Sequence, residues 1–535
     1  MARSRQVARI RIPTASVIVP GDPMAAPLIL RIHPTDNVAV ALRAAEPGAT
    51  FEGVAATEPI PGGHKLALRP IATGEPVIKY GYPIGVATAP IAAGAHVHSH
   101  NVRGNLPEKL SDLRFAEVVA TRPDSATASP SAPRPRDRSG DTFLGYRRPD
   151  GRAATRNEIW IVNTVGCVNI ASEKIAAAAH AELAAPGSGI DGVYAFPHPF
   201  GCSQLGDDLK HTQKVLAGLV RHPNAAAVLI LGLGCENNQM KDFLEIVGPQ
   251  AAERVRWFNA QQVSDEIESG LAAVRELATY ARRFQREPIP ASELILGMKC
   301  GGSDGFSGIT ANPLVGRIAD RHAAAGGTVL LTEVPEMFGA ERMLLERAVD
   351  ESVFRGVIDL VNDFRAYFQK HNEPIDENPS PGNKAGGITT LADKSLGCVQ
   401  KGGQAPVAQV LPYGATARTG LGGLALIQGP GNDGVSGTAM TIAGAHLLFF
   451  TTGRGNPMGF PAPTVKVASN TDLVTRKPQW IDFNAGAIAD GTAGFDELTD
   501  ALWKQLLAIA SGTERTRNEL RGHREIAIWK DGVTL

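Results

Sequence analysis

The sequence predicts an α/β protein that carries a small all-β domain near its N-terminus. Three observations support this fold class: short β-type runs over residues 28–105, a Pro- and Ser-rich stretch that ends at Asp141, and alternating strand-like and helix-like segments after it. The chain has 535 residues, which is more than one hydrophobic core usually serves, so several domains are expected.

Residues 28–105 form the predicted all-β domain. Runs such as GEPVIKYGYPIGVA and IAAGAHVHSHN are punctuated by Gly and Pro and show no helical period. Residues 106–141 are the predicted linker, because the segment TRPDSATASPSAPRPRDRSGD is rich in Pro, Ser and charge and has no apolar face.

Two α/β domains with mainly parallel sheets are predicted over residues 142–287 and 288–535. Helical segments such as SEKIAAAAHAELAA alternate with apolar runs of strand length, which is the pattern of βαβ units. We place the seam between the two domains at the Pro-marked turn QREPIPASEL.

Four of the predicted strands are followed by a short glycine-containing segment that ends in a cysteine. The runs IWIVNTVGC, VYAFPHPFGC, AVLILGLGC and LILGMKC end at Cys167, Cys202, Cys235 and Cys300. Strands buried on both faces have this composition, and ligands bind beyond the carboxyl ends of parallel strands. If the four strands are neighbours, the thiols converge as ligands for iron, for zinc or for an iron–sulfur cluster. The competing interpretation is that each cysteine is a small buried apolar side chain.

A weaker alternative for the metal site is the motif HVHSHN. Alternate residues of a strand share one face, so His96, His98 and His100 are placed to chelate one ion together. The competing interpretation is a solvated, histidine-rich edge strand.

Several Gly-rich loops carry polar or charged side chains, among them KCGGSDGFSGITANP, NPSPGNKAGGITT and TTGRGNP. Glycine allows the backbone to approach a ligand closely, and exposed backbone amides bind anions. Lys384 and Arg454 are predicted to bind a carboxylate, with Asn383 as a further substrate-binding candidate. Each loop by itself is also compatible with a tight turn.

The composition argues against several classes of protein. Hydrophobic residues make up 43% of the chain, charged residues 20%, and the formal net charge is −1, with no block of like charge that would follow a phosphate backbone. We therefore expect no nucleic-acid partner. The apolar runs are too short to cross a bilayer, so no membrane partner is expected either. Five cysteines at unpaired-looking spacings favour a reducing compartment and predict a cytoplasmic protein.

Long motifs run through nearly the whole chain: IHPTDNVAVAL, HVHSHN, RNEIWIVNTVGCVN, GCSQLGDD, HPNAAAVLILGLGCENNQ, CGGSDGFSGITANP, TEVPEMFGAE, ENPSPGNKAGGITTLADKSLGC, TTGRGNP and REIAIWKDGVTL. In these motifs the chain resembles the sugar-acid dehydratase family that includes altronate and galactarate dehydratases. The strings GCSQLGDD, GCENNQ, EVPEMFGAE and HVHSHN favour the altronate branch.

The resemblance implies an N-terminal domain of the β-clip type, called SAF, followed by two α/β domains. It also implies a hydro-lyase that dehydrates D-altronate to 2-dehydro-3-deoxy-D-gluconate in hexuronate catabolism, with Fe²⁺ or Mn²⁺ as the cofactor. Galactarate or another sugar acid is the alternative substrate. A small sugar acid is thus the expected partner, and a homo-oligomer is compatible with the sequence.

Dehydration of a 2,3-dihydroxy acid requires a base that removes the proton next to the carboxylate and an acid that protonates the departing hydroxyl. We predict His198 as the base, because a neutral imidazole is suited to that role near neutral pH. Asp304, Glu236 and Glu333 are the alternatives as acid, base or metal ligand.

Two other classes of protein compete with this prediction. Gly232 and Gly234 follow a strand as G-x-G, as in nucleotide-binding oxidoreductases, but Asn237 occupies the place of the third glycine. A non-enzymatic sugar-acid binding protein built on the same loops would bind the acid without forming a 2-keto product.

Overall fold

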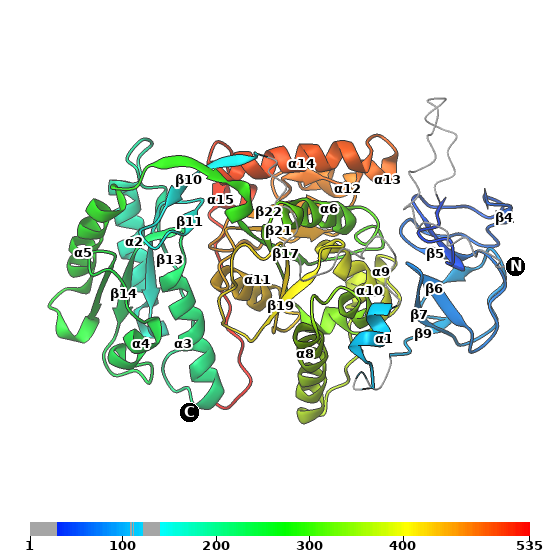
Figure 1. Cartoon of the computed structure of the whole chain (residues 1–535), viewed down its shortest axis with the longest axis horizontal. Coiled ribbons are helices and arrows are strands. Elements are labelled where there is room, and N and C mark those ends of the chain that lie inside the picture. The colour runs from blue at the N-terminus through cyan, green and yellow to red at the C-terminus, as the bar shows by residue number, and fades with distance from the viewer. Residues whose placement is uncertain (1–28, 107–109, 111, 121–139, 535) are drawn as a thin grey trace, which may run out of the picture.

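The computed structural model describes residues 29–106, 110, 112–120 and 140–534. An N-terminal β domain, a C-terminal α/β domain and a second α/β domain lie side by side along the longest axis, with the C-terminal domain in the middle (Figure 1). The predicted fold class is confirmed. The Pro- and Ser-rich core of the predicted linker, residues 121–139, lies outside the described residues.

The N-terminal domain is built from short antiparallel strands. One sheet has the order β1-β2-β5-β8, a second the order β6-β7-β9, and β3 and β4 form a hairpin. The strands are β1 (Ile29–Leu30), β2 (Val38–Ala41), β3 (Thr50–Phe51), β4 (Val54–Ala55), β5 (Lys65–Ala67), β6 (Pro76–Lys79), β7 (Tyr82–Ala87), β8 (His96–Val97) and β9 (Val102–Arg103).

Part of the predicted linker is a short helix. Helix α1 (Phe115–Ala120) packs against the C-terminal domain, and the ring of Phe115 lies edge-on to that of Phe354 at a centroid distance of 5.5 Å. Phe115 and Val118 supply apolar contacts to the core of the C-terminal domain, as do Leu106, Leu110 and Leu113 before them. Residues 115–120 of the predicted linker are thus helical, and most of the Pro- and Ser-rich segment that we expect not to order lies outside the described residues.

The second domain contains a parallel sheet with the order β13-β12-β14-β15 and a separate three-stranded antiparallel sheet, β11-β10-β16. Strand β16 pairs with β10, so the predicted boundary at residue 288 falls inside a strand of this domain. The elements are β10 (Thr142–Arg147), β11 (Ala153–Ala154), β12 (Glu158–Asn163), α2 (Asn169–Leu183), β13 (Gly192–Ala195), α3 (Gly206–Arg221), β14 (Ala225–Gly232), α4 (Met240–Val247), β15 (Val255–Asn259), α5 (Glu266–Ala281) and β16 (Arg286–Pro290).

The C-terminal domain contains a seven-stranded parallel sheet with the order β19-β20-β18-β17-β21-β22-β23. Its central strands are buried along their whole length, as expected for a sheet covered on both faces. The elements are β17 (Ile295–Cys300), α6 (Ala311–Ala324), β18 (Thr328–Leu331), α7 (Glu341–Leu345), α8 (Glu351–Lys370), α9 (Pro381–Ala385), α10 (Leu391–Cys398), β19 (Val407–Leu411), β20 (Gly423–Ile427), α11 (Asp433–Ile442), β21 (Leu447–Thr452), β22 (Thr464–Ala468), α12 (Thr471–Arg476), β23 (Phe483–Asn484), α13 (Ala487–Asp490), α14 (Phe495–Ala510) and α15 (Arg517–Arg521).

Shared hydrophobic cores join the three domains. Helix α6 covers one face of the seven-stranded sheet, and α11 covers the other and contacts α3 of the second domain. One core cluster includes Trp160 of the second domain and Phe450 of the C-terminal domain, and another includes Val77 of the N-terminal domain and Leu296. Burial of this apolar surface holds the domains together.

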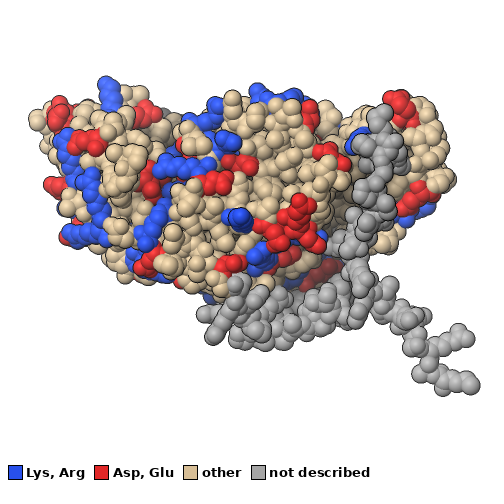
Figure 2. Space-filling view, turned by 90° about the horizontal axis from the view of Figure 1, so that it is seen from above, with Lys and Arg blue, Asp and Glu red and all other residues tan. Residues whose placement is uncertain are grey.

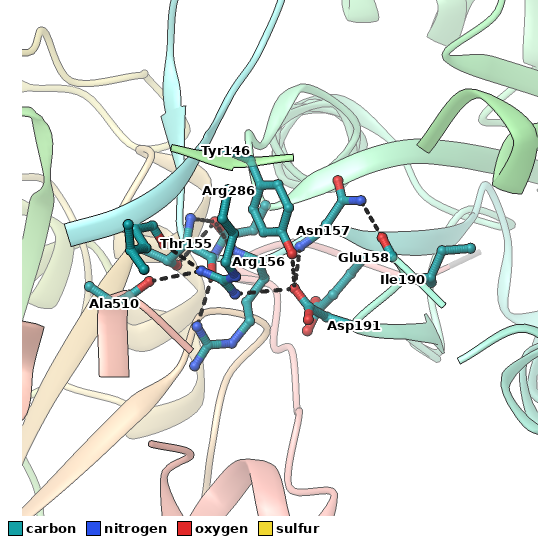
Figure 3. Close-up of polar contacts among 12 residues, drawn as sticks. Tyr146, Thr155, Arg156, Asn157, Glu158, Ile190, Asp191, Arg286 and Ala510 are labelled. Carbon is teal, nitrogen blue, oxygen red and sulfur yellow. Dashed lines mark hydrogen bonds and ion pairs between the residues drawn. The ribbon is translucent and has the colours of Figure 1, made fainter. Parts of the chain in front are cut away.

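Polar contacts reinforce the junction of the two α/β domains (Figure 3). The Arg286 guanidinium lies over the ring of Tyr146 and donates to the backbone carbonyl oxygens of Thr155 and Ala510. Asp191 accepts from the backbone N–H of Asn157 at 2.7 Å. Of these bonds, the one from Arg286 to Ala510 crosses to the C-terminal domain, and the others hold the second-domain side of the junction in shape.

The surface carries charges of both signs. Lys and Arg side chains are interspersed with Asp and Glu over the face seen in Figure 2. In the part of the chain that the structure describes, no helix has both the length and the apolar character needed to cross a membrane.

Candidate active site

A cavity of about 410 Å³ lies at the carboxyl edge of the seven-stranded sheet. The chain runs from β17 to β18 on one side and from β21 to β22 on the other, so the sheet reverses its winding between the neighbouring strands β17 and β21. Ligands of open parallel sheets bind at such a reversal. Asp304, Arg454 and Asn470, from the segments after β17, β21 and β22, line the cavity, and Leu42 and Gly62 of the N-terminal domain contribute to its wall.

Asp304 is the buried carboxylate of this cavity. Its Oδ1 accepts hydrogen bonds from the N–H and hydroxyl of Ser307 and from the Ser469 hydroxyl, whereas Oδ2 accepts only from Asn470, at 2.9 Å. Burial raises the pKa of Asp304, and the bonds from Ser469, Ser307 and Asn470 oppose that effect. Oδ2 therefore keeps a lone pair available to a ligand.

Arg454 supplies a positive charge to the same cavity. Its backbone N–H donates to Gly302 at 2.8 Å, which ties the loop after β21 to the loop after β17. Its guanidinium is exposed, lines the cavity and, among the described residues, has no ion-pair partner. An arginine held in this way is free to bind a carboxylate bidentately.

The loop that carries Lys384 and Asn383 borders the cavity through Gly386. Lys384 is half-exposed, two residues from that wall. Asn383 is buried and caps α9: its side-chain oxygen accepts from Ser380, and its amide donates to the Ser303 carbonyl at 2.8 Å. The structure therefore gives Asn383 a role in positioning α9 beside Asp304.

A buried ion triad fixes the N-terminal domain over this site. Lys65 and Lys79 of that domain donate to the two carboxylate oxygens of Asp393 on α10, each at 2.9 Å. Burial lowers the pKa of Lys65 to about 8, although Asp393 opposes the effect. Removing Asp393 would leave two buried ammonium groups without their partner, so the triad ties the domain to the cavity.

Four histidines gather on the N-terminal domain next to the cavity. Nδ1 of His64 lies 3.0 Å from Nε2 of His96, and Nε2 of His64 lies 3.4 Å from the carbonyl oxygen of Ala385. The ring of His98 is 4.9 Å from that of His64, and the exposed His100 is next to His96. Burial, together with neighbouring positive charge, lowers the pKa of His96 and of His98 to about 4, so their imidazoles are neutral near pH 7.

The buried Nδ1 of His98 has no hydrogen-bond partner among the described residues. Neutral imidazoles with a nitrogen that lacks a partner are suited to bind a divalent metal ion. His98 offers such a nitrogen, but in the described residues no three histidine nitrogens lie within 4.8 Å of one another, and both nitrogens of His64 already have partners, so the rings of His64, His96 and His98 would have to reorient to share one ion. His100, the third histidine of the predicted set, lies at the periphery.

A second group of potential ligands lies beneath the sheet edge. Ligand atoms of Cys300, Glu336 and Cys398 lie within 4.8 Å of one another, and all three residues are buried. The Lys401 ammonium donates to the Cys300 sulfur at 2.7 Å, and that of Lys394 lies 2.9 Å from Glu336. These lysines already neutralise the group, so a metal ion would have to compete with them.

Glu333 belongs to the same buried network. It adopts a left-handed backbone conformation with φ of 69°, and its Oε1 accepts from Lys299 at 2.7 Å and from Ser436 at 3.1 Å. Burial raises the pKa of Glu333, and the positive charge of Lys299 opposes this rise. Glu333 does not line the cavity, so its predicted catalytic role gains no geometric support.

The structure divides the predicted set of four thiols. Cys167, Cys202 and Cys235 follow β12, β13 and β14, which are neighbours in the sheet of the second domain, whereas Cys300 ends β17 in the other sheet. The condition for all four thiols to converge, that their strands be neighbours, is therefore not met, because the chain folds the strands into two sheets.

His198 and Glu236 lie in the second domain, away from the cavity lining. Nε2 of His198 bonds to the Asn163 carbonyl at 2.9 Å, and its Nδ1 accepts from the Phe200 N–H. Glu236 accepts from the backbone N–H groups of Leu233 and Gly234. Since both nitrogens of His198 are occupied, the structure lends no support to its predicted role as base.

Sequence reasoning missed His64, Lys65 and Asp393. His64 directly precedes β5, and Lys65 is the first residue of that strand. Strand β5 pairs with β8, and this pairing brings His64 next to His96. The sequence does contain a histidine in the run IPGGHKLAL, namely His64. The sequence alone does not show that this run pairs with the strand that carries His96.

Comparison with known proteins identifies the class of protein that combines this fold and this cavity. Family models match residues 27–105 as the altronate/galactarate dehydratase SAF domain, residues 145–282 as the second domain of D-galactarate dehydratase/altronate hydrolase, and residues 291–534 as the C-terminal domain of D-galactarate/altronate dehydratase. The chain belongs to the D-galactarate/altronate dehydratase family.

Individual relatives confirm the resemblance seen in the motifs. The chain is 46% identical to the altronate dehydratase of Bacillus subtilis (strain 168) and 48% identical to that of Escherichia coli (strain K12), in both cases over 95% of this chain and 99% of the relative. The galactarate dehydratase (L-threo-forming) of Escherichia coli (strain K12) is 34% identical over 94% of this chain and 96% of its own length. The altronate dehydratases are thus the more similar of these relatives.

Proposed function

We propose that this protein is a hydro-lyase that dehydrates D-altronate to 2-dehydro-3-deoxy-D-gluconate in the cavity at the edge of the seven-stranded sheet. The observation that carries the proposal is the placement of Asp304 and Arg454, which has no ion-pair partner within the described ranges, on opposite sides of the β17/β21 reversal, facing one polar cavity. The higher identity to altronate dehydratases than to the galactarate relative supports altronate as the substrate.

Arg454 binds the substrate carboxylate in this proposal, with Lys384 adding positive charge from the neighbouring loop. As the proton on C2 leaves, negative charge gathers on the carboxylate, and the guanidinium stabilises that charge. A polar cavity of about 410 Å³ accommodates a six-carbon acid.

Asp304 transfers the proton. Its Oδ2 takes the proton from C2 and delivers it to the hydroxyl on C3, which leaves as water while the C2–C3 double bond forms. The resulting enol then tautomerises to the 2-keto acid, so no electrons are gained or lost. Burial raises the pKa of Asp304 and so makes the carboxylate a stronger base toward a weak carbon acid.

His64, His96 and His98 are the residues that would hold Fe²⁺ or Mn²⁺. A divalent ion there supplies Lewis acidity toward the oxygens of the substrate. The proposal places the histidines ahead of the thiols for this ion, because Gly62 lines the cavity and His64 contacts the loop that carries Gly386.

The test is a 2-keto acid assay on anaerobically purified protein with altronate, galactarate, mannonate and gluconate. We expect the highest kcat/KM with altronate. A clear preference for galactarate would reassign the substrate within the family. Tight binding of all four acids without 2-keto product would instead indicate a binding protein.

A further inference from the structure

Three Gly-Cys pairs lie side by side in the second domain, outside the proposed catalytic cavity. Cys202, Cys167 and Cys235 follow β13, β12 and β14, and each is preceded by glycine. These strands occupy consecutive positions in the parallel sheet, with β12 in the middle. The carboxyl ends of the three strands therefore present three cysteines along one edge.

The three loops are locked to one another by backbone contacts. The N–H of Gly166 donates to Phe200 at 2.8 Å, and that of Asn238 donates to Gly201 at 2.9 Å. Gly201 has a φ of +101°, and a Cβ atom there would overlap the backbone of Thr164. Close packing of this kind requires glycine and fixes where each following cysteine starts.

Side chains that the proposed reaction does not use also support these loops. His198 bridges to the end of β12 through the Asn163 carbonyl, and Glu236 accepts from two N–H groups of the Cys235 loop. Ser203, next to Cys202, has a φ of +55°, a conformation that costs energy for a residue with a side chain. The loops are thus held in place before any ligand binds.

All three cysteines are exposed, whereas Cys300 and Cys398 are buried. The interpretation of cysteine as a small core side chain therefore fits the latter pair and not the former three. Exposed free thiols are prone to oxidation, so three on one edge call for a ligand that uses them.

The helices that start at this edge also leave their first N–H groups uncapped. The N-cap residues Val168, Leu205 and Gln239 of α2, α3 and α4 provide no side-chain hydrogen bond, whereas Asp265 caps α5. Three helix N-termini directed at one edge favour an anionic ligand there.

Exposed apolar side chains lie near the cysteines in the chain. Ile170 is 63% exposed and Leu205 is 52% exposed, and each lies three residues after a cysteine. Val533, 77% exposed, is brought alongside by the pairing of Gln204 with Thr534. Apolar side chains next to a metal site lower the local polarity around a ligand on the thiols.

The spacing of the three thiols distinguishes a site for a single metal ion from a site for a cluster. A tetrahedral ion draws its thiolates together at bonds of about 2.3 Å. Within the described ranges, no three ligand atoms among Cys167, Cys202, Cys235 and their neighbours lie within 4.8 Å of one another. A cluster holds its thiolates farther apart, because each sulfur binds a different iron, and neighbouring strands are spaced about 4.8 Å apart.

We propose that Cys167, Cys202 and Cys235 bind a [4Fe–4S] cluster as three thiolates, each of which releases its proton to solvent on binding. The fourth iron has no ligand from these loops and is open to an oxygen donor from solution. This second metal centre is independent of the histidine site and of the proposed reaction. In its 2+ state the cluster assembles from two ferrous ions, two ferric ions and four sulfide ions, so no electrons are gained or lost, and it involves no residue of the catalytic cavity.

The test is anaerobic reconstitution of the full chain with ferrous iron, ferric iron and sulfide, followed by iron and acid-labile sulfide analysis, visible absorption and Mössbauer spectroscopy. We expect about four sulfide per chain, accompanied by about four iron beyond any iron held at the histidine site, with the spectrum of a cubane cluster. Cys167→Ser, Cys202→Ser and Cys235→Ser should each lose at least half of the sulfide while melting at the wild-type temperature, because the thiols are exposed.

Cys300→Ser is the matched control, because it belongs to the predicted four-thiol set but lies in the other sheet. It should retain the full sulfide content; Cys398→Ser serves the same purpose should Cys300→Ser fail to fold. His96→Ala should lower only iron that is not accompanied by sulfide, which separates this centre from the histidine site. Absence of sulfide from reconstituted wild type, or full sulfide in all three surface variants, would overturn the proposal. One sulfide-free iron bound through the three thiols would overturn it in favour of a mononuclear site.

Discussion

Gly453 leaves the space that the Asp304 carboxyl group occupies: a Cβ atom at position 453 would overlap the carboxyl carbon and both oxygens. Gly453 follows β21 and Asp304 follows β17, so this contact crosses the reversal of the sheet. The position of the proposed proton-transfer group thus depends on the absence of a side chain on the neighbouring strand.

Gly453→Ala should displace the Asp304 carboxylate and lower kcat/KM by about 100-fold, because a shift on the order of 1 Å in a catalytic group has an effect of that size. Steady-state kinetics and thermal melts check this expectation. Gly104→Ala is the control, because its Cβ would meet open space. Equal kinetics in the two variants would contradict a catalytic position for Asp304.

Arg454→Ala should remove about 2 to 5 kcal/mol of transition-state stabilisation, because the substrate carboxylate would lose its paired N–H donors. Part of the loss should appear in kcat, since negative charge builds up on the carboxylate during the reaction. Arg454→Lys should restore little activity. The control is Arg521→Ala, whose side chain is exposed and bonds to Gln479. Unchanged kcat/KM in Arg454→Ala would exclude the carboxylate role.

Chelation followed by gel filtration should abolish turnover, and Fe²⁺ or Mn²⁺ should restore it. His64→Ala and His96→Ala should lower bound metal, measured by elemental analysis, and reduce kcat by more than the 10- to 100-fold that outer-shell changes typically cause. His371→Ala, whose partner is Asp531 on the surface, should leave both unchanged. If both histidine variants keep full metal content, the ion is bound elsewhere, and the Cys300, Glu336 and Cys398 group becomes the first candidate.

The buried pair Arg156–Glu519 should make stability depend on pH in the acid range. Burial works to raise the pKa of Glu519, but the charge and hydrogen bonds of Arg156 outweigh it and lower that pKa from 4.5 to about 2. The lowered pKa stabilises the fold fully above pH 4.5, and this stabilisation is lost as pH falls toward about 2. It corresponds to about 3 kcal/mol of unfolding free energy.

Denaturant unfolding between pH 7 and pH 3 tests this pair. Glu519→Gln should be less stable at pH 7 and should show a shallower decline with acid than wild type. The exposed pair Arg283–Glu253 is the control, and Glu253→Gln should have little effect at any pH. Parallel pH curves for wild type and Glu519→Gln would contradict the assignment.

Much of the fold was predictable because it rests on local patterns. The runs ending at Cys167, Cys202, Cys235 and Cys300 are strands, and they lie in parallel sheets as their uninterrupted apolar composition indicates. The short helix at 115–120 was missed because its stability comes from packing against Phe354, a contact that composition alone does not indicate.

The site was predictable in part. Asp304 and Arg454 were identified as polar residues in Gly-rich loops, and both line the cavity. His198 and Asn383 have the same local appearance, yet their polar atoms are occupied by neighbouring backbone and side-chain groups. Whether a polar side chain is available to a ligand depends on its hydrogen-bond partners, and these come from distant parts of the chain.

The sequence by itself determined the fold class, the family and the candidate residue types, because periodicity, turn residues and long motifs are local properties of the chain. Only the tertiary structure decided which of those residues meet. It placed Cys300 in a different sheet from the other three thiols, brought His64 to His96 through the pairing of β5 with β8, and set Asp304 beside Arg454 at the reversal of the sheet. The physical reason is that strand order and pairing follow from burial of apolar surface over the whole domain, which no local pattern specifies.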